Sequence, residues 1–67
     1  MLNSFTDVNG TKVLKGELVS LVDIEGYTSI YVVKSISRRR RKVEVCLFDN
    51  VTQTYMYANS KQLVSEM

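Results

Sequence analysis

The chain has 67 residues, 45% of them hydrophobic, and its nine lysines and arginines against seven acids give a net charge of +2. This length allows one domain near the lower size limit for unaided folding, and the apolar content argues against disorder. A single cysteine excludes an intrachain disulfide, and the absence of histidine removes the commonest metal ligand and general base. We therefore expect one folded domain over residues 1–67, without a cofactor and without enzyme activity.

The N-terminus has no basic start and no long apolar stretch, so the sequence predicts neither a signal peptide nor a membrane span. The expectation is a cytoplasmic protein in which Cys46 stays reduced. A homodimer would relieve the shortage of core in so short a chain, and the sequence permits one without requiring it.

Short segments rich in Val, Ile, Tyr and Thr alternate with frequent turn residues along the whole chain. This pattern favours a small all-β barrel. The first segment surrounds Asn9-Gly10, a strong hairpin dipeptide, so residues 1–15 are expected to form either a hairpin or an irregular turn. The next strand is predicted over residues 17–24, where both faces are apolar, as in a strand that is covered on both sides.

A second strand is predicted over residues 28–37. Side chains alternate between the two faces of a strand, so Tyr31 and Val33 should share one face and Ile36 should lie on the other. A third strand is predicted over residues 42–49, which alternate most cleanly. Its apolar face, assigned to the core, consists of Val43, Val45 and Leu47.

The fourth strand is predicted over residues 53–58, where Tyr55 and Tyr57 share one face. The tail, residues 59–64, is expected to form one helical or 3₁₀ turn followed by a short last strand. Asn59 or Ser60 would cap that turn, because both residue types favour the position before a helix.

Two stretches near the N-terminus, Asp7-Val8-Asn9-Gly10 and Gly16-Glu17-Leu18-Val19, resemble the opening of small SH3-like barrels. The stretches that fall where such domains place their later strands and 3₁₀ turn are Gly26, Tyr31-Val32-Val33, Ile36, residues 43–49 and Ser60-Lys61-Gln62-Leu63-Val64. The likeness is greatest to stand-alone SH3-like proteins of bacteriophages and prophages, and more distant to Tudor and KOW domains.

The resemblance implies an SH3-like barrel of about five strands with a short 3₁₀ turn near the C-terminus, and a phage or prophage origin. It does not imply a function, because this type of barrel supports many activities. Proline-rich peptide binding fits poorly, since the chain has no tryptophan. A methyl-lysine cage would need aromatic rings that converge. The rings available for such a cage are Tyr27, Tyr31, Phe48, Tyr55 and Tyr57.

The most unusual feature is the basic run of residues 38–42, Arg38-Arg39-Arg40-Arg41-Lys42. Without these five residues, four basic residues face seven acids, which leaves the rest of the chain at −3. The run lies between two predicted strands and so should occupy a hairpin tip. Charge focused in this way suits a polyanion such as DNA or RNA, because guanidinium groups bind phosphates through paired hydrogen bonds. The alternatives are a solvated tip that maintains solubility and a charged strand end that blocks pairing at the sheet edge.

The leading hypothesis is a small binding module that contacts nucleic acid through Arg38, Arg39, Arg40, Arg41 and Lys42. Its candidate base-stacking residues are Tyr31, Tyr55 and Tyr57, although tyrosine is also a routine half-buried strand residue. A second hypothesis is a protein-interaction module for a host or phage protein, in which the arginines meet an acidic protein surface. A third is a minor structural or self-associating protein.

Other polar residues have simpler interpretations. Cys46 lies in the middle of a predicted strand and is expected to be a packing residue, since no histidine is present to activate it. Asp23, Glu25 and Asp49 lie at predicted strand ends, where such residues commonly stabilise turns. Nothing in the sequence brings these three carboxylates together for acid–base chemistry.

Overall fold

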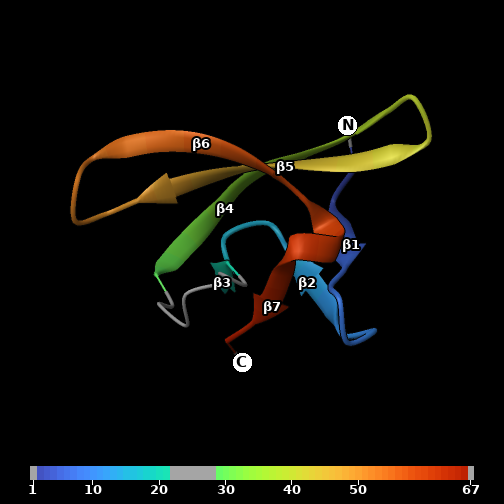
Figure 1. Ribbon diagram of the computed structural model, residues 1–67, viewed down its shortest axis with the longest axis horizontal. Helices are drawn as coiled ribbons and strands as arrows, with labels where there is room; N and C mark the ends of the chain where they lie inside the picture. Colours follow the sequence, from blue (N-terminus) through green and yellow to red (C-terminus); the bar gives the residue numbers. More distant parts are fainter. Residues whose placement is uncertain (1, 22–28, 67) are drawn as a thin grey trace.

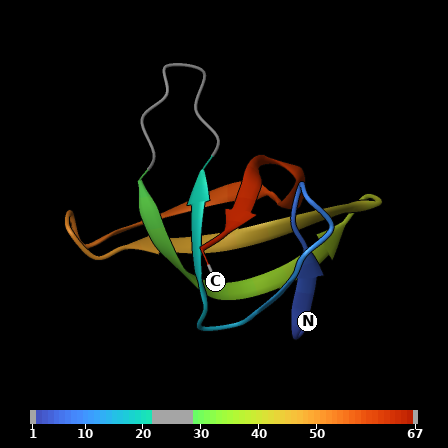
Figure 2. The same cartoon turned by 90° about the horizontal axis from the view of Figure 1, so that it is seen from below.

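The computed structural model describes residues 2–21 and 29–66, which form two antiparallel sheets and one 3₁₀ turn (Figures 1 and 2). The smaller sheet pairs β1 (Ser4–Thr6) with β2 (Lys12–Leu14). The larger has the order β6-β5-β4-β3-β7. Its strands are β3 (Leu18–Leu21), β4 (Ile30–Arg39), β5 (Lys42–Asp49), β6 (Thr54–Asn59) and β7 (Leu63–Ser65), with the 3₁₀ turn η1 (Ser60–Gln62) before the last.

This arrangement confirms the predicted all-β, barrel-like domain with a 3₁₀ turn near its C-terminus. The main sheet has the expected five strands, and the N-terminal hairpin adds two more among the described residues. No helix in this part of the chain has the length and hydrophobicity needed to cross a membrane. Residues 22–24 of the predicted first long strand lie outside the described residues, as do Tyr27 and the predicted turn at Gly26.

The core lies between the two sheets. Its buried apolar residues are Phe5, Val13, Val19, Tyr31, Val33, Ile36, Val45, Leu47, Ala58 and Leu63. Val45 and Leu47 have no exposed surface, which confirms the predicted core face of β5, and Val43 packs against the edge of the same cluster. Burial of each valine, leucine, isoleucine or phenylalanine side chain in this cluster stabilises the fold by about 1.5–3 kcal/mol.

A β-bulge in β4 overturns one prediction from strand alternation. Val33 pairs with Leu47 of β5, but the neighbouring β5 residue pairs with Ser35, so Lys34 is an extra residue on β4. An extra residue reverses the alternation of side chains beyond it. Ile36 therefore lies in the core at 1% exposure, on the same face as Tyr31 and Val33 rather than on the opposite one.

The N-terminal hairpin closes around the buried carboxylate of Asp7. Its Oδ1 accepts hydrogen bonds from the backbone amides of Asn9 (2.9 Å) and Thr11 (2.8 Å), and Gly10 completes the turn at φ +84°. Its Oδ2 accepts from the backbone amide of Ser65 in β7 (2.8 Å). One side chain thus shapes the predicted hairpin and also joins it to the C-terminal strand, 58 residues away.

These hydrogen bonds stabilise the ionised form of the carboxyl group. The Ser65 amide has the largest effect and lowers the pKa of Asp7, burial opposes it, and the amides of Thr11, Asn9 and Gly10 lower the pKa further.

The C-terminal turn is capped as predicted. Asn59 Oδ1 accepts a hydrogen bond from the Lys61 backbone amide (2.9 Å), and the backbone amide of Asn59 donates to Gln62 Oε1 (3.0 Å). This reciprocal pair is a capping box. It fixes where the chain leaves β6 and therefore where the exposed side chain of Lys61 lies.

Candidate nucleic-acid interface

The basic run forms the tip of the β4–β5 hairpin, where the sequence predicted it (Figure 1). Arg39 pairs with Lys42, which leaves Arg40 and Arg41 as a two-residue turn. Both have positive φ angles, +50° and +69°. This is the pattern of a type I′ turn, in which Asn-Gly is strongly preferred because the left-handed region costs other L-residues roughly 1–2 kcal/mol each. The turn therefore holds two arginines at positions where local energetics favour other residues.

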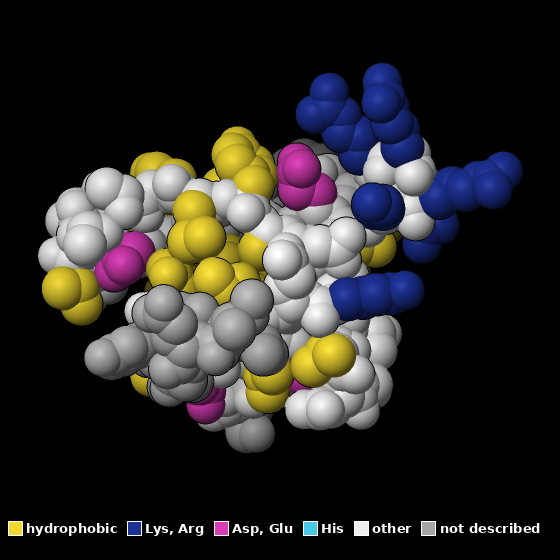
Figure 3. Space-filling model, in the orientation of Figure 1, with side chains coloured by type: hydrophobic (Ala, Val, Ile, Leu, Met, Phe, Trp, Pro, Cys, Tyr) yellow, Lys and Arg dark blue, Asp and Glu magenta, His cyan; other side chains and the backbone are white. Residues whose placement is uncertain are grey.

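All five side chains of the basic run are exposed to solvent. In Figure 3 the lysine and arginine side chains project away from the body of the molecule at the hairpin end. Within residues 2–21 and 29–66, no carboxylate forms an ion pair with Arg38, Arg39, Arg40 or Arg41. The arginines are thus not used to neutralise the acids of the described part of the protein.

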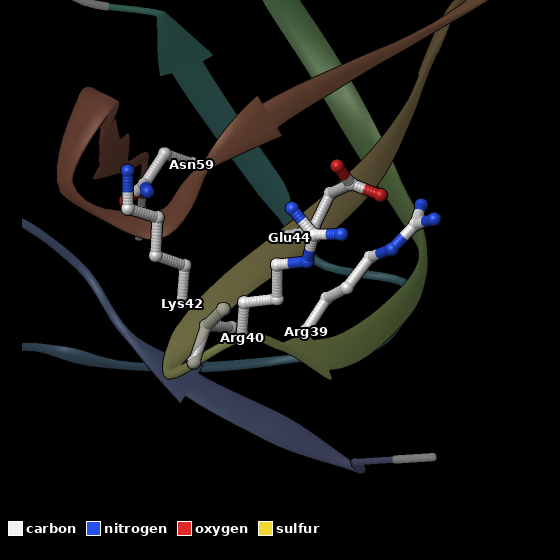
Figure 4. Close-up of a pocket in the computed structure, with 6 residues that line it drawn as sticks. Arg39, Arg40, Lys42, Glu44 and Asn59 are labelled. Atoms are coloured by element: carbon white, nitrogen blue, oxygen red, sulfur yellow. The ribbon is translucent and has the colours of Figure 1, made fainter.

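A shallow hollow opens on one side of the hairpin (Figure 4). Arg39, Arg40 and Lys42 line it, together with Glu44 of β5 and Asn59 at the end of β6. The side chains of Arg39 and Arg40 extend along the same side of the hairpin as Glu44, whereas Lys42 extends toward Asn59. Three cations and one carboxylate therefore share this hollow.

Two neighbouring hollows bring in basic residues from other parts of the chain. Lys61 of η1 lines the second hollow with Arg41 and Lys42, and Lys12 of β2 lines the third with Arg38. Val43 pairs with Arg38 next to the turn and contributes to all three hollows, so they surround the turn end of the hairpin.

Only Lys15 and Lys34, of the nine basic residues, do not line this region. We call the other seven the basic end: Lys12, Arg38, Arg39, Arg40, Arg41, Lys42 and Lys61. The sequence did not point to Lys12 and Lys61, because they are isolated lysines far along the chain from the run. Only the docking of β2 and η1 near the hairpin reveals them.

The structure separates the three tyrosines proposed for stacking. Tyr31 is buried in the core at 8% exposure, so its ring is not accessible to a base and it is removed from the candidate site. Tyr55 and Tyr57 are 64% and 66% exposed on β6. The sheet therefore presents two of the three rings to solvent.

The exposed tyrosines belong to a partly apolar outer face of the large sheet. Tyr55 pairs with Phe48 of β5, and their ring centroids lie 4.9 Å apart with a tilt of 54°. Phe48 pairs in turn with Val32 of β4, and Val32 with Leu18 of β3. Lys34 Nζ lies 5.3 Å from the centre of the Phe48 ring, within cation–π range.

The remaining candidates have structural positions. Cys46 is buried, consistent with packing. Asp49 Oδ1 accepts hydrogen bonds from the amides of Val51 (2.9 Å) and Thr52 (3.3 Å) in the β5–β6 turn. Asp23 and Glu25 lie outside the described residues, so their predicted turn role is not observed.

Comparisons with models of protein families, with curated proteins and with solved structures find no match to this chain. The resemblance to phage SH3-like proteins thus stays a prediction from sequence.

Proposed function

We propose that this protein is a small, non-enzymatic module that binds the phosphates of nucleic acid through its basic end. The observation that carries the proposal is the turn of Arg40 and Arg41. Both residues occupy left-handed backbone conformations, and neither guanidinium forms an ion pair with any described carboxylate. Backbone strain retained at an exposed site is typical of functional positions.

The chemistry of the basic end suits phosphate oxygens. Each guanidinium can donate two parallel hydrogen bonds to one phosphate, and the separate hollows place cations on several sides of the turn end of the hairpin. Contacts of this kind fix the position of a polyanion but do not read base sequence. If the five residues of the basic run each neutralise one phosphate, a plot of the logarithm of the affinity for duplex DNA against log salt should have a slope of roughly −4.5.

The proposal includes a cytoplasmic location, where DNA and RNA are accessible. It also includes the phage or prophage origin that the sequence resemblance implies. In that setting the module would act beside phage or host nucleic acid.

The test is a titration of labelled single- and double-stranded oligonucleotides at several salt concentrations. The main variant is Arg40→Asn/Arg41→Gly, which places the preferred type I′ residues in the turn and removes two charges. We expect it to fold at least as stably as the wild type and to bind more weakly. The magnitude of the salt slope on duplex DNA should decrease by about 1.8. Weaker binding then cannot be ascribed to unfolding.

A matched control is Gln53→Gly. Gln53 also has a positive φ, +59°, but it lies in the β5–β6 turn, and among the described residues its side chain hydrogen-bonds to Asn50 alone. This variant introduces a turn glycine without changing the charge, so its affinity should equal that of the wild type. Absence of binding by the wild type at low salt would disprove the proposal.

An acidic protein partner is the second candidate, and the exposed apolar side chains of the outer face favour it. Leu18 and Ile30 are 46% and 56% exposed, and they contribute contact area that a phosphate backbone does not need. The same variants distinguish the two functions. This second function would be supported if the wild-type protein fails to bind oligonucleotides but binds a polyglutamate-coated surface through the basic run.

A further inference from the structure

We infer that the nucleic acid recognised is single-stranded, with its bases stacked on Tyr55 and Tyr57 and its phosphates held by the basic end. This inference rests on the proposed function and narrows it to one class of ligand. It depends on the position of the two tyrosines relative to the hairpin, on the way their rings are supported, and on their exposure.

The geometry supplies a continuous track along β6. Tyr55, Tyr57 and Asn59 alternate with the inward-facing residues of this strand, so they point to the same side of the sheet. Successive members of this row are about 6.8 Å apart in an antiparallel strand. Asn59, the last member, lines the hollow that contains Arg39, Arg40 and Lys42. A single-stranded nucleic acid whose bases stack on the two rings would therefore extend to the cations of the basic end.

The exposure of the rings favours a single strand over a duplex. A duplex presents phosphates and the edges of its bases, whereas the faces of the bases are covered by their neighbours. An unpaired strand can turn its bases outward onto aromatic side chains, and this stacking works with any base. Tyr55 and Tyr57 offer accessible rings, which a duplex contacted only through its phosphates would leave unused.

The neighbours of Tyr55 prepare its ring for stacking. The tilted contact with Phe48 at 4.9 Å restricts the ring while leaving most of the side chain exposed. The ammonium group of Lys34 lies near Phe48 on this sheet and adds a positive charge beside the rings. The aromatic end of the track therefore also attracts phosphate.

One carboxylate lies beside the track. Glu44 pairs with Asn59 across β5 and β6 and shares the hollow with the cations. A phosphate passing from Tyr57 to Arg40 would be repelled by this charge. Neutralising it in Glu44→Gln should therefore tighten single-strand binding by roughly two- to fivefold at low salt.

The experiment compares a 12-nucleotide oligo(dT) with a 12-base-pair duplex, measured by fluorescence anisotropy. The variants are Tyr57→Thr, Tyr55→Thr/Tyr57→Thr and the conservative Tyr57→Phe. Threonine suits an exposed strand position, and thermal melting checks that the fold is retained. We expect the double variant to lose roughly tenfold or more in oligo(dT) affinity, with little change in duplex affinity or in the salt slope. Tyr57→Phe should retain wild-type affinity, because the ring and not the hydroxyl stacks.

A second readout uses the protein's own fluorescence. The chain contains no tryptophan, so its emission reports tyrosines directly. Oligo(dT) should quench this emission in the wild type, and the quenching should fall in the double variant.

The outcomes separate this inference from the proposed function. If Arg40→Asn/Arg41→Gly weakens binding but the tyrosine variants bind oligo(dT) like the wild type, the single-strand inference is wrong and the phosphate interface stands. If the wild type binds duplex and oligo(dT) with equal affinity and without quenching, the single-strand inference is also wrong and the phosphate interface stands. If no oligonucleotide binds at low salt, both proposals fail.

Discussion

Two turns of this protein both need positive φ angles but use opposite kinds of residue at these positions. The β1–β2 turn places Gly10 where φ is positive and satisfies three backbone amides with the Asp7 carboxylate. The β4–β5 turn places Arg40 and Arg41 at positive φ and leaves their side chains in solvent. The first turn follows the local preferences of its residues, and the second contradicts them.

The difference indicates what each turn contributes. The Asp7 turn ties the N-terminal hairpin to β7, so its interactions stabilise the fold. Within residues 2–21 and 29–66, the side chains of Arg40 and Arg41 form no hydrogen bond or ion pair, and Asn-Gly would suit their backbone conformation better. A residue choice that costs stability, at a turn whose side chains have no partner among the described residues, supports the proposal of a partner outside the domain.

The largest effect should come from removing the carboxylate of Asp7. Asp7→Ala leaves the amides of Asn9, Thr11 and Ser65 without their acceptor, and we expect the melting temperature to fall by about 10 °C or more. Asp7→Asn keeps one acceptor oxygen for the local turn but not for Ser65, so its loss should be smaller. Thermal unfolding followed by circular dichroism measures both. A neutral result for Asp7→Ala would show that this turn does not hold the termini together.

The same residue predicts a pH dependence. The folded state lowers the pKa of Asp7, chiefly through the Ser65 amide, so its contribution to stability is complete above the usual pKa of 3.8 and is lost as pH falls through the lowered folded value. Melting temperatures of the wild type and Asp7→Asn should therefore converge as pH falls below the usual pKa of 3.8. The other carboxylates are present in both proteins, so the difference isolates Asp7. Parallel curves over this range would contradict the assignment.

The arginine turn should respond in the opposite direction. Arg40→Asn/Arg41→Gly relieves the left-handed strain and removes two of the adjacent positive charges, so we expect a gain of about 1 kcal/mol in the free energy of unfolding, or about 4–8 °C in melting temperature. Urea unfolding of the two proteins provides the measurement. Destabilisation would mean that the arginines make a structural contribution, and the contrast between the two turns would disappear.

The smallest effect tests the extension of the basic end beyond the run. Lys61→Gln removes one cation from the hollow shared with Arg41 and Lys42 while keeping a long polar side chain. If Lys61 contacts phosphate, the salt slope on oligo(dT) should decrease by about 0.7 with little change in stability. Lys15→Gln is the control, since Lys15 lines none of the three hollows. Equal slopes for both variants would restrict the interface to the run itself.

Local features of the sequence determined much of the architecture. Alternation over residues 42–49 predicted β5 with the bounds Lys42–Asp49 and the correct core face, because strand geometry fixes side-chain direction with a period of two. Asn9-Gly10 indicated a hairpin or an irregular turn, and the structure has the hairpin. Of the two residues expected to cap η1, Asn59 and Ser60, Asn59 is the cap. The position of the basic run at a hairpin tip also followed from its place between two strand patterns. These features depend only on residues near one another in the chain.

Tertiary structure decided the rest. The β-bulge at Lys34 places Ile36 in the core. The sequence of β4 did not reveal this bulge, because the pairing with β5 determines which residue of β4 is the extra one. Tyr31 and Tyr55 are the same residue type in similar strand patterns, yet one is buried and the other exposed, because burial depends on which sheet face meets the second sheet. Lys12 and Lys61 joined the basic end only when β2 and η1 packed near the hairpin. The sequence alone could thus locate the charge, while the packing of distant segments set the extent of the surface around it.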